Sequence, residues 1–309
     1  MHSHSQMPHR VHGDRAGPRL CCPRGHTRAG PASSVAAASA PHVDLSRSRL
    51  LSKAALLSCN AYASRRRVGG SRGGRCVAIE QPSGKIAALV VRDPTYGVIV
   101  AFSGCRSVDE LLCCANVGFV DVAEPDAASA AKLSVNAAIW RRYDAVRAQL
   151  LETLGEALGR QAAGSERGVT FTGHSLGGAV AQLAAFTLDS ELYLAERGLG
   201  CMSVSFGAPR VGDAGYASAL RRQSDARGGE DVHVRVVLEH DIVPALRLHS
   251  RLVHAGSELR LPEEAPSTAA FPMDLLENHS SRRYLVAANR TLNLACDGGR
   301  VGFRTPRSS

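Results

Sequence analysis

Between residues 169 and 238 the sequence alternates between short β-prone runs and helix-prone stretches. Strands are expected at 169–172, 202–206 and 232–238, and helices from 176 and over 214–222. Alternation of this kind requires parallel strands joined by crossover helices, because a tight turn cannot connect parallel neighbours. The sequence therefore predicts an α/β fold with a mostly parallel central sheet and helices on both faces.

Further strand and helix patterns precede this alternation. Apolar runs at 76–79, 87–91 and 97–102 are separated by turn residues, which indicates an antiparallel meander that enters the sheet. Apolar residues recur every third or fourth position over 44–63 and again over 139–158. Both stretches are expected to be helices that pack on the sheet.

A chain of 309 residues with 44% hydrophobic residues suits one sizeable core and an extension. We expect a basic N-terminal segment over 1–42, a folded α/β domain over 43–295 and a C-terminal tail over 296–309. The start of the chain is rich in Arg, Ser and Ala, which fits an organellar transit peptide (plastid or mitochondrion) and low-complexity disorder equally well. The oligomeric state stays open.

The net charge of +9 is concentrated at the start of the chain, where residues 1–75 hold thirteen Lys and Arg against Asp14 and Asp44. The remainder is slightly acidic, so it offers no basic groove and no nucleic-acid partner is expected. Nine scattered cysteines without CxxC spacing favour reduced thiols and an intracellular protein, and no metal or cofactor is predicted. No run of eighteen apolar residues occurs, so any contact with a membrane or lipid droplet would be peripheral.

The strongest motif is Gly173-His174-Ser175-Leu176-Gly177, which stands between a β-prone run and a helix-prone run. This context is typical of a nucleophile elbow, in which the serine occupies a strained turn above the sheet. The two glycines are expected because neighbouring chain leaves no room for larger side chains. His174 is expected to pack beside the elbow, because adjacent side chains in such a turn point apart.

A serine nucleophile needs a general base and an acid that orients the base, and in this fold the order along the chain is Ser, acid, His. Asp241 follows the predicted strand at 232–238, where α/β sheets place their sites, and Glu239 and Asp231 are its rivals. The histidines at or beyond the elbow are residues 174, 233, 240, 249, 254 and 279. His279 is favoured as the base because it follows the others and heads a helical stretch, but position alone leaves the rest open.

Several blocks between Ser46 and Leu292 resemble the fungal-type lipase family, also called lipase class 3. They comprise Gly-His-Ser-Leu-Gly-Gly-Ala-Val-Ala at 173–181, Phe-Gly-Ala-Pro-Arg-Val-Gly-Asp at 206–213, His-Asp-Ile-Val-Pro at 240–244, His-Ala-Gly-Ser-Glu-Leu-Arg-Leu at 254–261, and His279 with Tyr284. The resemblance implies that Asp241 and His279 complete a catalytic triad with Ser175. It implies hydrolysis of acylglycerol esters, with acyl groups of phospholipids or galactolipids next.

The family's Phe-Arg-Gly-Thr or Phe-Arg-Gly-Ser block reads Phe102-Ser103-Gly104-Cys105 here. By resemblance, the backbone NH groups of Cys105 and Leu176 form the oxyanion hole. The family's arginine is replaced by Ser103 and its hydroxyl residue by a thiol, which is a weaker donor. These departures leave a second hypothesis, a catalytically impaired relative that binds lipid or regulates.

The resemblance also implies a lid after the oxyanion strand, over residues 108–122. The apolar residues Leu111, Leu112, Val117, Phe119 and Val120 are its candidates for covering the site. An ordinary buried helix is the alternative for this segment.

Overall fold

The computed structural model describes residues 45–62, 76–107, 110, 118–124, 132–159, 168–229, 232–262, 278–296 and 303–304. Side chains are described within 48–62 of the first segment and within 278–291 of the last helix. Contacts divide the chain into two units, Met1–Ser39 and Ala40–Ser309, and all described residues lie in the second.

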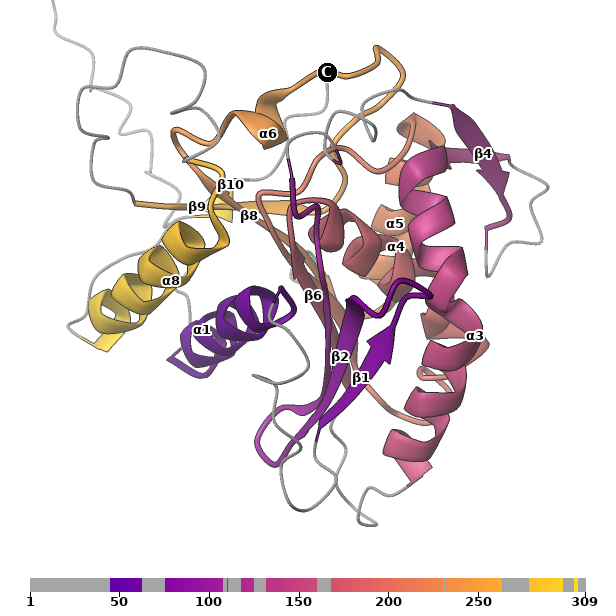
Figure 1. The fold of residues 1–309 in the computed structure, drawn as a ribbon, viewed down its shortest axis with the longest axis horizontal. Coiled ribbons are helices and arrows are strands. Elements are labelled where there is room, and N and C mark those ends of the chain that lie inside the picture. Colours follow the sequence, from indigo (N-terminus) through magenta and orange to yellow (C-terminus); the bar gives the residue numbers. More distant parts are fainter. Residues whose placement is uncertain are drawn as a thin grey trace, which may run out of the picture. The chain divides into compact units, whose positions relative to one another are not determined.

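An eight-stranded sheet forms the centre of the second unit, in the order β1-β2-β3-β6-β7-β8-β9-β10 (Figure 1). Its strands are β1 (Cys76–Glu80), β2 (Ile86–Asp93), β3 (Gly97–Phe102), β6 (Val169–His174), β7 (Cys201–Phe206), β8 (His233–Leu238), β9 (Ser257–Leu261) and β10 (Phe303–Arg304). The pairs from β3 to β9 are parallel, whereas β1, β2 and β10 pair antiparallel at the two edges. The predicted meander and mostly parallel sheet are therefore confirmed.

Helices cover both faces of this sheet, as expected for an α/β-hydrolase fold (Figure 1). Two of them, α1 (Leu45–Asn60) and α8 (Ser281–Cys296), lie side by side on one face. The other face carries α3 (Ala137–Gly159), α4 (Leu176–Glu191) and α5 (Ala214–Ala226). No described helix is long and apolar enough to cross a lipid bilayer.

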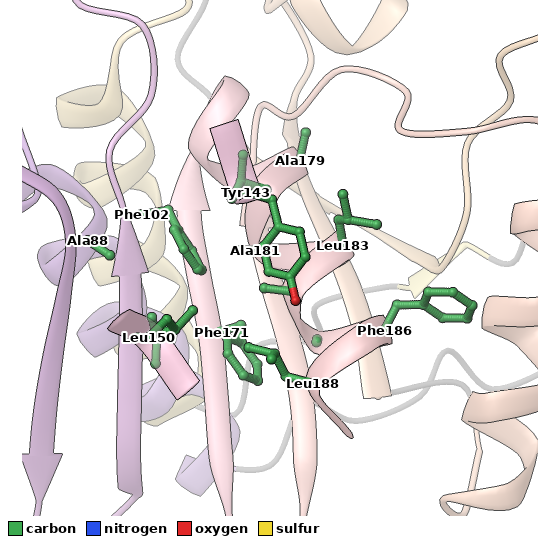
Figure 2. Packing of buried hydrophobic residues seen from close by; sticks show 14 of the residues in the cluster. Ala88, Phe102, Tyr143, Leu150, Phe171, Ala179, Ala181, Leu183, Phe186 and Leu188 are labelled. Atoms are coloured by element: carbon green, nitrogen blue, oxygen red, sulfur yellow. The ribbon is translucent and has the colours of Figure 1, made fainter. Parts of the chain in front are cut away.

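The larger core lies between the sheet and α3, α4 and α5. Tyr143 and Leu150 from one face of α3 point toward Phe102 on β3 and Phe171 on β6 (Figure 2). Each large side chain buried in this way stabilises the fold by roughly 1.5–3 kcal/mol. The β6 strand is buried along its whole length, because helices cover both faces of the parallel strands.

Two features differ from the expected organisation. Within the expected lid, residues Phe119–Val122 form β4, which pairs with β5 (Leu133–Asn136) in a separate two-stranded sheet. Phe119 and Val120 are therefore strand residues, whereas 108–109 and 111–117 lie outside the described residues. Within the expected tail at 296–309, the described residues Phe303–Arg304 form β10, an edge strand that pairs with β9.

A chain of buried polar side chains links β7, β8, α4 and α5. Gln223 donates through Nε2 to Asp189 Oδ2 at 3.2 Å, so its Oε1 accepts from His233 Nε2 at 3.1 Å. His233 Nδ1 then accepts from the Ser203 hydroxyl at 2.9 Å. Arg227 Nε donates to the other end of the chain, Asp189 Oδ2, at 3.0 Å. His233 is therefore a neutral structural histidine and has no free nitrogen for catalysis.

Acid is expected to destabilise the fold through His233. Burial lowers the pKa of His233 to about 3 from 6.5, so below pH 6.5 the unfolded chain takes up a proton that the folded chain refuses. The free energy of unfolding should then fall by up to about 1.4 kcal/mol per pH unit from this histidine as pH drops from 6.5 toward 3. His233→Gln should flatten that slope in urea unfolding at several pH values. The control His240→Gln should keep it, because His240 is partly exposed; equal slopes in both variants would contradict the assignment.

Candidate active site

Ser175 occupies the turn between β6 and α4 in a strained backbone conformation. Its φ is 58° and its ψ is −132°, a combination that costs on the order of 1–3 kcal/mol for a residue with a side chain. A Cβ on Gly173 would overlap the backbone of Gly177, and a Cβ on Gly177 would overlap the carbonyl oxygen of Phe102. The two glycines of the motif are therefore required by close packing, as the sequence predicts.

Ser175 is also the N-cap residue of α4, yet its side chain makes no capping hydrogen bond. An N-cap serine usually accepts a hydrogen bond from the first turn of its helix. Here the backbone fixes the residue instead, because Ser175 N donates to Phe206 O at 2.8 Å. The hydroxyl is therefore not used by the helix and stands at the positive end of the α4 dipole.

Asp241 follows β8 and caps the short helix α6 (Ile242–Ala245). Its carboxylate accepts hydrogen bonds from Val243 N at 2.9 Å, from Tyr284 Oη at 2.6 Å and from His279 Nδ1 at 2.8 Å. The carboxylate is fully buried. Three donors on one carboxylate fix its orientation.

Gly207 leaves the space that this carboxylate and its tyrosine occupy. Its φ is +60°, and a Cβ there would stand 2.6 Å from Asp241 Oδ2 and 3.0 Å from Tyr284 Oη. Tyr284 Oη also accepts from Leu238 N at 3.2 Å, so α8 is tied to the end of β8. The Phe-Gly-Ala-Pro block thus makes room for the carboxylate at Gly207 and holds the Ser175 backbone through the Phe206 carbonyl.

His279 presents one nitrogen to Asp241 and leaves the other for chemistry. Its Nδ1 donates to both carboxylate oxygens, at 3.0 and 2.8 Å, so Nε2 is the basic nitrogen of the neutral ring. Nε2 is buried and makes no hydrogen bond among the described residues, Ser175 Oγ included. The structure brings the acid and the base together, whereas the base and the serine are not hydrogen-bonded in it.

His174 packs against His279, with ring centroids 4.5 Å apart. Its Nδ1 lies 3.0 Å from Tyr62 Oη. Burial, and then the nearby His279, hold the pKa of His174 well below its ordinary value. A neutral ring in this position fills the space beside the base without adding a charge, which agrees with the expectation that His174 packs beside the elbow.

Cys105 and Leu176 come from two backbone segments that pack against each other. A Cβ on Gly177 would stand 2.8 Å from the carbonyl carbon of Ser103 and 2.9 Å from Gly104 N. The Ser175 carbonyl accepts from Gly178 N at 3.0 Å, so the Leu176 NH of the same peptide group points the opposite way. The two predicted oxyanion donors thus belong to neighbouring loops at the elbow.

The rivals for acid and base lie elsewhere. His254 Nε2 bonds to Pro244 O at 2.7 Å, the ring of His249 contacts Phe119, and Glu239 is exposed. Asp231 lies outside the described residues. Of the described histidines, only His279 hydrogen-bonds to Asp241.

Two side chains at the site were not predicted from the sequence. Tyr62 follows α1 and bonds to His174, and Arg142 on α3 donates to the carbonyl of Gly104 at 3.0 Å. A tyrosine after a helix and an arginine on a helix surface carry no signal of such contacts. Both depend on how α1 and α3 dock on the sheet.

A separate apolar cavity of about 420 Å³ opens at the other end of the parallel strands. Gly168, Gly200 and Val232, which precede β6, β7 and β8, line it together with Leu51 of α1. Ser175 and Asp241 instead follow β6 and β8. This cavity is therefore not part of the candidate site.

A nucleophile-type turn after one parallel strand and an aspartate–histidine pair after another meet at the carboxyl edge of this sheet. That arrangement defines the class of α/β-hydrolase-fold proteins with a serine-centred site.

Comparisons with known proteins agree with this class. Residues 99–250 match the family described as lipase (class 3). A lipase of Rhizomucor miehei is 28% identical over 211 residues, which cover 67% of this chain and 53% of that protein. The structure of a Rhizomucor miehei lipase propeptide complex superposes with a TM-score of 0.55 at 24% identity, covering 84% of this chain and 88% of that one.

A third similarity is to protein EDS1L of Arabidopsis thaliana, 35% identical over 122 residues, or 37% of this chain and 18% of that protein. The match with the fungal lipase spans about half of that protein's length. The chain is therefore similar to class 3 lipases over residues 99–250, and it shares the fold of the solved fungal lipase.

Proposed function

We propose that this protein is a serine carboxylester hydrolase of acyl lipids, with Ser175 as nucleophile, His279 as general base and Asp241 as the acid that orients the base. The single observation that carries the proposal is the pair of hydrogen bonds between His279 Nδ1 and the Asp241 carboxylate, at the sheet edge where Ser175 stands strained.

The reaction follows from these positions. Ser175 Oγ attacks the acyl carbonyl carbon while His279 Nε2 takes the hydroxyl proton, and Asp241 stabilises the imidazolium that forms. Cleavage of the ester C–O bond then releases the alcohol, which receives the proton from His279. Water, deprotonated by His279, attacks the acyl-enzyme, and the fatty acid leaves as Ser175 regains its proton.

Backbone NH groups of Cys105 and Leu176 stabilise the negative oxygen of the tetrahedral intermediate. Two such donors, fixed in place before the reaction, lower the barrier more than donors that must reorient. The Cys105 thiol is a weak donor, so the backbone NH carries most of this effect.

Acylglycerol is the proposed substrate, and acyl groups of phospholipids or galactolipids are the alternatives with the same mechanism. Similarity to class 3 lipases supports an acyl lipid, and head group and chain length are open to measurement. Fluorogenic esters of rising acyl length, presented as monomers and as emulsions, test this proposal. Rates that do not rise with acyl length would overturn the lipid assignment but leave ester hydrolysis intact.

Labelling with a fluorophosphonate probe tests the nucleophile directly. We expect stoichiometric labelling of Ser175, located by peptide mass spectrometry, and no labelling after heat denaturation. Absence of labelling in folded protein would favour the second hypothesis, a catalytically impaired relative that binds lipid or regulates.

Alkylation of Cys105 is expected to inhibit hydrolysis. Cys105 is partly exposed on the oxyanion loop, so an added group there would obstruct the site. The Cys105→Ser variant should resist iodoacetamide that inhibits the parent protein. Cys76→Ser is the matched control, because Cys76 is also partly exposed but lies on the edge strand β1. Equal inhibition of parent and Cys105→Ser would discard the prediction.

A further inference from the structure

The backbone between β3 and Cys105 is held from the side by an arginine of α3. Arg142 Nη2 donates to Gly104 O at 3.0 Å and also approaches Ser103 O at 3.4 Å and Ser103 Oγ at 3.5 Å. The guanidinium thus meets two successive carbonyl groups of this loop. One nitrogen, Nη2, makes these contacts, and its two N–H groups allow it to donate to both carbonyls.

We propose that Arg142 is the positioning residue of the oxyanion hole: by holding the Gly104 carbonyl, it aims the NH of Cys105 at the developing oxyanion. This inference rests on the proposed function. In a planar trans peptide the C=O and the following NH point in opposite directions. A guanidinium on the carbonyl side therefore fixes where the Cys105 NH points on the other side.

Two further contacts restrict Gly104, the residue that carries this carbonyl. The Gly104 NH bonds to Tyr62 Oη, and a Cβ on Gly104 would overlap that hydroxyl and the carbonyl of His174. The Gly104 Cα therefore cannot move toward the elbow. With Tyr62 on one side and the elbow behind, Arg142 fixes the remaining freedom, the rotation of the Gly104–Cys105 peptide.

Arg142 also acts on the strength of the donor. A cation bonded to a peptide carbonyl polarises the whole amide, so the NH of that amide becomes a stronger donor. The acid Glu110 also feels the charge of Arg142, but its hydrogen bonds come from Arg106 N at 2.8 Å and from Lys85 Nζ at 3.5 Å. The hydrogen bonds of Arg142 thus go to the backbone of the loop.

The sequence of the loop explains why an outside arginine is needed. Position 103 carries serine where the resembling family carries arginine, and Ser103 Oγ donates to Ile86 O at 2.8 Å on the neighbouring strand. Ser103 therefore ties the loop to the sheet but brings no charge to Gly104. Arg142, 39 positions away from Ser103, supplies that charge from α3.

The test compares Arg142→Met, Arg142→Lys and the control Arg141→Met in the full-length protein. Arg141 is exposed and bonds within its own helix, to Ala137 O at 3.2 Å. We expect Arg142→Met to lower kcat about tenfold to a hundredfold with little change in KM, because a misaimed oxyanion donor acts only in the transition state. Lysine at 142 should restore part of kcat, and millimolar guanidine should restore part of it in Arg142→Ala.

Amide hydrogen exchange gives a readout that does not depend on turnover. Peptides that contain residues 103–105 should exchange faster in Arg142→Met than in the parent and in Arg141→Met, while peptides of β6 and β7 stay protected. Unchanged exchange together with unchanged kcat would overturn the inference, as would a loss of kcat that lysine and guanidine both fail to restore. A parent protein without Ser175-dependent hydrolysis would overturn the proposed function instead, and the exchange rates would still decide whether Arg142 holds the loop.

Discussion

Replacing Ser175 by alanine is expected to lower kcat for ester hydrolysis by on the order of 10⁴- to 10⁶-fold, because no other group can form the acyl-enzyme. The fold should persist, since the serine hydroxyl makes no capping bond to α4. Initial rates on a medium-chain fluorogenic ester measure the effect, and circular dichroism checks the fold.

Ser224→Ala is the matched control for this variant. Ser224 is also buried, but its hydroxyl bonds within α5, to Leu220 O at 3.0 Å. Its rate should equal that of the parent. If Ser175→Ala hydrolysed the ester as fast as Ser224→Ala, the proposed nucleophile would be wrong.

Asp241→Asn is expected to lower kcat by about 10⁴-fold while the protein stays folded. The amide can donate to His279 Nδ1, which would move the ring proton to Nε2 and remove the base that faces Ser175. Substrate binding should change little, because Asp241 is buried behind the histidine. Steady-state kinetics that separate kcat from KM measure this effect.

Glu239→Gln provides the comparison, because Glu239 is an exposed carboxylate two positions away and was the rival acid. That variant should retain the parent rate. A large loss of kcat in Glu239→Gln with a small loss in Asp241→Asn would reverse the assignment of the acid.

Local sequence patterns predicted much of this fold. The apolar repeat over α3 and the β-prone runs over β6 and β8 predict which side chains are buried. In the structure, the apolar residues of these repeats are buried. The edge strand β10 escaped prediction because it has two residues, and pairing with β9 decides its conformation. The strand β4 was not predicted either, because its conformation also depends on pairing. Its partner β5 begins eleven positions after β4 ends.

The candidate site was predictable only in part. Ser175 and its glycines carry a local signal, since the turn itself demands them. His279 could be ranked above the other histidines chiefly by resemblance, because its place beside Asp241 depends on α8 folding back over β8. Tyr62 and Arg142 reach the site through the docking of α1 and α3, which no local pattern encodes.

The pairing of α1 with α8 makes the chemistry depend on the two ends of the domain at once. Ser52 Oγ donates to Ala288 O, 236 positions later, and Cys59 Sγ to Ser281 O. The family match covers 99–250, so a fragment of those residues would contain the proposed nucleophile and acid but neither His279 nor Tyr62. With His279 as the proposed base, hydrolysis is expected to begin during synthesis only after α8 has emerged and packed against α1, so activity would report that both helices are in place.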